Sequence, residues 1–210
     1  MKKEVGNKDF NIWLLGDSNP KQWEDVLEYP LDSRHPIRHN IWTSILDYVQ
    51  DRVYRRIRKR VDSHSLYIRN AVENPDIKPK GNHVDWKTVV GIEINEFKHL
   101  LEEYQPKLLF SFGAFSYEFA RRSLNRDPKR KYSYWSAKRL GQDFRRSAET
   151  FDLSTTNLMP LLHRVVSGGK FVQSQDHFCG EDSVNYFEYV GYLIADLLIE
   201  NESKVDVWIT

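Results

Sequence analysis

NIWLLGDSNP, residues 11–20, joins a short apolar run to a group of turn-forming and polar residues. A short apolar run that stops at Gly16 is typical of a buried strand, which we expect over residues 11–15. Ligands of open α/β sheets bind outside the carboxyl ends of the strands. Asp17, Ser18 and Asn19 directly follow this apolar stretch and Gly16, so they are the first candidates for a functional site.

Further apolar runs alternate with amphipathic patterns along the chain. We expect strands at residues 65–72, 108–112 and 157–162, and helices at residues 39–61, 86–104, 115–124 and 184–200. The intervening predictions are a polar lead-in at 1–10, a short helix near 22–27 and a loop at 164–182. This alternation predicts an α/β fold, a three-layer α/β/α arrangement whose central, mainly parallel sheet has about four strands. We expect residues 1–210 to form a single domain with a helical insertion at about 132–151.

The composition shows that any basic binding surface has to be local. The 210 residues are 40% hydrophobic, and their net charge is only +1. Residues 52–60, RVYRRIRKR, form one basic cluster. It has two interpretations, a solvated helix end whose cations complement the helix dipole or a patch that contacts phosphates.

The sequence contains no pattern for a metal or a cofactor. Cys179 is the single cysteine, which excludes a disulfide scaffold, a four-cysteine zinc site and a cysteine-ligated iron–sulfur cluster within one chain. The histidines lack the paired spacing of a zinc site, and neither a P-loop nor a dinucleotide fingerprint occurs. Since a signal peptide and a membrane span are also missing, we expect a cytoplasmic monomer that contacts no membrane and uses no metal or cofactor.

Polar residues mark the ends of three of the four predicted strands. Asp17 and Asn19 follow the first strand, Asn70 lies at the end of the second and His163 follows the fourth. The third strand stops at Gly113, and a helix is predicted almost directly after it. Because the carboxyl ends of parallel strands lie at one edge of a sheet, we expect these residues to converge there.

Gly16-Asp17-Ser18 resembles the opening block of GDS-type esterases, in which the serine is the nucleophile. That chemistry requires a His–Asp pair to activate the hydroxyl. In those enzymes the two residues lie three positions apart near the carboxyl end, whereas Asp176 and His177 are adjacent here. A serine esterase that uses Ser18 is therefore kept as a second alternative function.

Six segments, in the right order, resemble the uracil-DNA glycosylase superfamily. They are NIWLLGDSNP, YPLDSRHPIRHNIW, SLYIRNAVENP, HVDWKTVVGIEINEF, LLFSFGAFSYEFA and MPLLHRVVSGGKF, the last followed by DHFCG and NYFEYVG. The resemblance spans roughly residues 11–199, and the cysteine count fits a divergent member without an iron–sulfur cluster. It implies an enzyme that extrudes a uracil or a damaged base from DNA, holds it in a pocket and hydrolyses its N-glycosidic bond.

The resemblance implies a role for each residue at the strand ends. Asn19 matches the position that orients water at the sugar C1′. Asp17 is the nearby alternative, and its charge would stabilise an oxocarbenium-like transition state. Asn70 would pair with the edge of the base, and His163 would donate a hydrogen bond to a base oxygen as negative charge develops there.

Further residues are implied to contact the base or the DNA. Tyr29 or Leu31 would cover the face of the base. Val165 and Val166 match side chains that wedge into the minor groove. The other DNA-binding residues implied by the resemblance, several of them at phosphates, are Arg164, Ser167, Gly168 and Lys170.

Each of these residues also has an ordinary structural interpretation. Asn70 would then close a strand as a turn-former, His163 would be a buried histidine bonded to backbone, and residues 164–170 would be a surface loop. The chain also departs from the family pattern, because Arg164 and Val165 follow the histidine where the family has proline and serine, and Lys21 follows the first motif. These departures keep a first alternative open, a catalytically inactive relative that binds nucleic acid or nucleotides.

Overall fold

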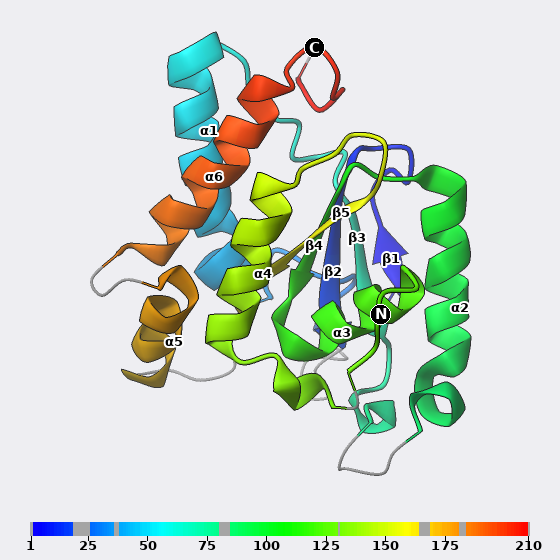
Figure 1. Ribbon diagram of the computed structural model, residues 1–210. Helices are drawn as coiled ribbons and strands as arrows, with labels where there is room; N and C mark the ends of the chain where they lie inside the picture. Colours follow the sequence, from blue (N-terminus) through cyan, green and yellow to red (C-terminus); the bar gives the residue numbers. More distant parts are fainter. Residues whose placement is uncertain are drawn as a thin grey trace.

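The computed structural model describes residues 2–18, 26–35, 38–79, 85–129, 131–163, 169–180 and 184–209. Over these residues the chain is an α/β protein in which a mainly parallel, five-stranded sheet packs against six α-helices (Figure 1). The predicted α/β class with a mainly parallel central sheet is therefore confirmed.

The sheet has the strand order β1-β3-β2-β4-β5. Its strands are β1 (Glu4–Val5), β2 (Ile12–Ser18), β3 (Tyr67–Val72), β4 (Leu108–Phe112) and β5 (Asn157–Leu161). The last four run parallel to one another, whereas β1 pairs antiparallel with β3. The carboxyl ends of β2, β3, β4 and β5 therefore lie at the same edge of the sheet.

The count of about four strands was one too low, because β1 lies in the stretch expected to be a polar lead-in. A strand of two residues has no apolar period that a sequence pattern can show. β1 is held instead by its backbone pairing with β3 and by the hydroxyl of Tyr67, which donates to the Glu4 carboxylate at 2.5 Å.

Six α-helices connect and cover the strands. They are α1 (Ser44–Ile57), α2 (Trp86–Tyr104), α3 (Gly113–Ser123), α4 (Ala137–Glu149), α5 (Gly169–Cys179) and α6 (Tyr186–Glu200), with short helical turns at Arg38–Thr43, Pro75–Ile77 and Tyr132–Tyr134. α1 packs along α6, and α2 packs beside α3 (Figure 1). None of the helices in the described part of the chain has the length and apolar character that a membrane span requires.

Two helical segments differ from the sequence-based expectation. The helix predicted at 39–61 is α-helical only over α1, because the backbone at Arg58 turns into the left-handed region with a φ of 60°. The predicted loop at 164–182 was wrong for residues 169–179, which form α5. The fully buried ring of Phe178 anchors α5 between Phe144 of α4 and Tyr186 of α6, and such tertiary packing leaves little local signal.

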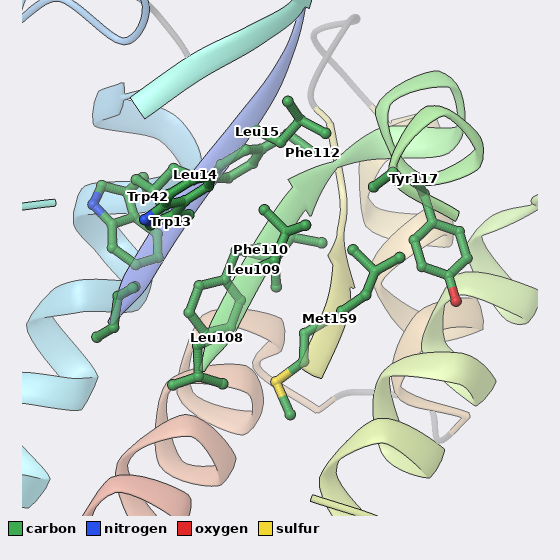
Figure 2. Packing of buried hydrophobic residues seen from close by; sticks show 14 of the residues in the cluster. Trp13, Leu14, Leu15, Trp42, Leu108, Leu109, Phe110, Phe112, Tyr117 and Met159 are labelled. Carbon is green, nitrogen blue, oxygen red and sulfur yellow. The ribbon is translucent and has the colours of Figure 1, made fainter. Parts of the chain in front are cut away.

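The core lies on both faces of the sheet. Figure 2 shows the clustered side chains of β2 and β4 and their neighbours, including Phe110, which is paired in register with Met159 of β5. On one face, Trp42 packs its ring against Phe110 and Phe112. On the other, Trp13 packs against Tyr67, Phe97 and Tyr104, with ring centroids 4.3 to 6.2 Å apart. Strands buried on two faces explain why their sequences read as continuous apolar runs.

Two helical glycines give a matched test of this packing. A Cβ at Gly191 of α6 would lie 2.6 Å from the Tyr48 Cβ and 2.9 Å from the Ile45 carbonyl oxygen of α1. We expect Gly191→Ala to lower the free energy of unfolding by about 1 to 3 kcal/mol through overpacking. Gly91→Ala of α2, whose new Cβ would meet only the Lys87 Cγ at 3.6 Å, should be neutral or gain up to about 1 kcal/mol from helix propensity.

Urea unfolding followed by tryptophan fluorescence measures both variants. Equal midpoints for Gly191→Ala and the unmodified chain would contradict the close α1–α6 contact.

Candidate functional site

A small cavity lies at the carboxyl edge of the sheet. Its lining combines strand-end residues with two residues of the loop that follows β2, and comprises Gly16, Asp17, Ser18, Leu31, His35, Asn70, Phe112 and His163. Its volume is about 20 Å³, enough for about one water molecule. The structure thus brings together Asp17, Asn70 and His163, the described polar residues that the sequence placed at strand ends.

The side chain of Asn70 fits into this site because its neighbour in the sheet is a glycine. Gly16 of β2 is paired in register with Asn70 of β3. A Cβ built on Gly16 would lie 2.2 Å from the Asn70 Oδ1, closer than real atoms approach. The missing side chain of Gly16 therefore provides the space that the buried carboxamide of Asn70 occupies.

Gly113 makes room for His163 in the same way. Gly113 follows β4 directly, and its φ of +87° favours glycine. A Cβ built on Gly113 would lie 2.6 Å from the His163 Cβ. The tight turn from β4 into α3 thus allows His163 to approach the edge of the neighbouring strand.

The carboxylate of Asp17 forms an ion pair with Lys78, and both side chains are largely buried. Lys78 immediately follows the helical turn Pro75–Ile77, and its Nζ lies 5.5 Å from the ring centroid of Phe115. This contact brings a cation to the candidate site and offsets the negative charge of Asp17.

The loop of residues 26–35 is held in shape by a buried carboxylate. Asp32 accepts hydrogen bonds from the side chain and backbone of Arg34 and from the backbone of Glu28. The hydrogen bonds from the Arg34 guanidinium are the main cause that holds the pKa of Asp32 far below its usual range. Arg38 donates to the carbonyl of Leu31 at 3.0 Å, and Leu31 has a φ of 52°, a strained backbone for a leucine. These bonds fix the loop that presents Leu31 and His35 to the cavity.

The two imidazoles at the cavity are neutral near pH 7. Burial lowers the pKa of His163, an effect that the Asp17 carboxylate opposes and the Lys78 ammonium reinforces. Burial and the nearby His163 lower the pKa of His35 to about 4. Each neutral imidazole offers one N–H donor and one acceptor nitrogen.

Of the other residues predicted to contact the base or the DNA, Leu31 also lines the carboxyl-edge cavity. Asn19 and the predicted DNA-contacting residues 164–168 lie outside the described residues, as does most of the short helix predicted near 22–27. Lys170 is in the first turn of α5. Tyr29 lines a second cavity, of about 210 Å³, which it shares with Leu31 and Trp42.

Sequence reasoning did not find His35 or Lys78. Both come from loops rather than from strand ends, and no periodic pattern places a loop side chain. Gly113 was noted as a strand terminator, but its role as space for His163 appears only when β4 and β5 are set side by side.

Within the described ranges, the esterase interpretation gains two imidazoles, but the nearby carboxylates of Asp17 and Asp32 are already engaged by Lys78 and Arg34. Ser18 lines the same cavity as His35 and His163. Asp32, whose charge raises the pKa of His35, is already engaged by Arg34 and by backbone N–H groups. His177, the partner considered from the sequence, is exposed on α5.

The pH dependence of stability tests whether the His35 imidazole is neutral in the folded protein. Between pH 6.5 and about 4 the unfolded chain binds a proton at His35 that the folded chain does not, so the free energy of unfolding should fall with falling pH. We expect His35→Gln to remove roughly 1 to 2 kcal/mol of that fall. Urea unfolding at pH 7 and pH 5 measures this change in the free energy of unfolding.

The control is His99→Gln, which replaces a histidine with a side chain 78% exposed and should leave the pH dependence intact. An unchanged pH dependence in His35→Gln would refute the assignment.

The described residues contain no group of three or more His, Cys, Asp or Glu side chains that could hold a metal ion. No protein-family model matches the chain, and no curated protein matches it in sequence.

Proposed function

We propose that the chain has the three-layer fold of the uracil-DNA glycosylase superfamily and hydrolyses the N-glycosidic bond of a uracil or damaged base extruded from DNA. The observation that supports this proposal is the convergence of Asp17, Asn70 and His163 on one cavity at the carboxyl edge of the sheet. In this proposal Asn19 positions the attacking water, and residues 164–168 with Lys170 contact the DNA.

The proposed base recognition uses uncharged groups. The carboxamide of Asn70 carries donor and acceptor groups of the kind that pair with the edge of a base. His163, whose pKa is lowered mainly by burial, can donate from a neutral ring to a base oxygen. That hydrogen bond strengthens as the C1′–N bond breaks, because the bonding electron pair leaves on the base.

The proposed hydrolysis is completed by water. The water oxygen bonds to C1′, and its proton passes to the departing base or to the Asp17 carboxylate. Asp17 would also stabilise the positive charge that develops on the sugar. The ion pair with Lys78 reduces that effect, so the described charges support a modest catalyst.

Entry of a base requires the cavity to widen, since a volume of about 20 Å³ admits only about one water molecule. The strand ends are fixed by the sheet. Leu31 and His35 come instead from the loop of residues 26–35. We therefore propose that this loop moves away when a base enters.

A duplex with a single uracil tests the proposal. Incubation followed by alkali should cut the strand at the uracil, and a panel of damaged bases extends the assay. His163→Ala and Asn70→Ala should each reduce the rate by about 100-fold or more, as expected for loss of a group that acts on the transition state. His99→Ala, an exposed histidine on α2, is the matched control. Folded protein that cuts none of the substrates would refute glycosylase activity.

The ion pair of Asp17 with Lys78 favours a second candidate, a relative that binds a nucleotide or nucleic acid without hydrolysis. A carboxylate whose charge is offset is a weaker stabiliser of a cationic transition state. This candidate predicts salt-sensitive binding to DNA without cleavage, and binding that Asn70→Ala weakens.

A further inference from the structure

A larger cavity lies between α2 and the end of α3, apart from the carboxyl-edge cavity. Its volume is about 440 Å³, within the range of small-molecule sites. Trp86, Lys87 and Asn95 of α2 form one side, and Arg122 of α3 with Arg126 after it forms the other. α2 is kinked beside it, since Val90 has a φ of −133° and a ψ of 19°.

The charge of the cavity lining is entirely positive. Its lining contains Lys87, Arg122 and Arg126, and none of the described lining residues is an aspartate or glutamate. A concave surface of one charge sign concentrates ligands of the opposite sign. This composition points to an anion.

Arg126 is a largely buried cation of this lining, and its charge is offset only at longer range, by Asp143 and Tyr117. Arg122 donates to Glu118 at 2.8 Å, whereas no ion pair joins Arg126 to a carboxylate within the described ranges. Arg126 donates to the Thr156 carbonyl at a long 3.5 Å. Burial is the main cause that lowers the pKa of its guanidinium. A partly desolvated guanidinium of this kind gains most from an anion that reaches it.

The cavity also offers a planar surface. The Arg122 guanidinium lies 4.2 Å from the ring centroid of Trp86, and Trp86 stacks on Phe115 with centroids 5.6 Å apart. The guanidinium is held in place by Glu118 and by the Lys129 carbonyl, so it forms a fixed plate on which a flat ring can stack. The amides of Asn95 and Asn125 add donors and acceptors at the rim.

We infer that this cavity binds a small organic anion with a planar ring, of the nucleoside monophosphate class, with Arg126 as the contact for its phosphate and Arg122 as the plate for its ring. The inference does not depend on the function proposed for the carboxyl-edge cavity. The two cavities are nevertheless joined by direct contacts, because Lys78, the partner of Asp17, lies over the ring of Phe115, on which Trp86 stacks.

Isothermal titration with uridine 5′-monophosphate, uridine and inorganic phosphate tests the inference. The monophosphate should bind saturably, and uridine and inorganic phosphate should each bind at least 10-fold more weakly. Arg126→Gln should weaken binding of the monophosphate at least 10-fold. Arg56→Gln, which removes an exposed arginine of α1, should leave it unchanged.

Asn95→Leu is a second variant that tests the cavity even if Arg126→Gln does not fold. Asn95 is exposed, and its replacement narrows the cavity without removing a charge. It should also weaken the monophosphate at least 10-fold. Equal affinities for uridine and the monophosphate, or for inorganic phosphate and the monophosphate, would overturn the inference. Unchanged binding in Asn95→Leu, or equal losses in Arg126→Gln and Arg56→Gln, would overturn it as well.

Discussion

The parallel register of β2 on β3 sets Gly16 opposite Asn70, and the carboxyl-edge site depends on that pairing. A side chain at position 16 would occupy the space of the Asn70 carboxamide. A slip of one residue would turn the asparagine to the other face of the sheet. Such a slip would also separate the rings of Trp13 and Tyr67, which are paired in register and packed with centroids 4.3 Å apart. The hydrophobic core thus determines where a polar group can stand at the edge.

The carboxyl-edge cavity presents dipoles more than net charge. Asp17 is matched by Lys78, and the histidines are held neutral mainly by burial. A buried site without net charge avoids the large desolvation cost of an unpaired ion. Such a site recognises a neutral ligand well. The cavity beside α2 has the opposite character, since its charged lining residues, Lys87, Arg122 and Arg126, are all cations.

The elements that could be predicted from the sequence are those with a clear local pattern of apolar residues. The strand at 108–112 and the helix at 86–104 have the predicted bounds, because one is a continuous apolar run and the other has a full amphipathic period. β1 and α5 were not predicted, since β1 is held by Tyr67 of β3 and α5 by the packing of Phe178 against α4 and α6, and neither contact leaves a local sequence pattern. At the site, the position of Asn70 near Asp17 and His163 could be predicted from the strand ends, whereas His35 comes from a loop, which has no such pattern.

Asp32 finds its side-chain partners within its own loop, in Glu28, Ser33 and Arg34. These bonds hold the loop together as one unit, and two further bonds tie it to its surroundings, from the Lys2 N–H to the Glu28 carbonyl and from Arg38 to the Leu31 carbonyl. Withdrawing Leu31 from the core exposes one apolar side chain, which costs about 1.5 to 3 kcal/mol. Under the proposed function, the loop would therefore open as one rigid flap, and binding of the base would have to offset that cost.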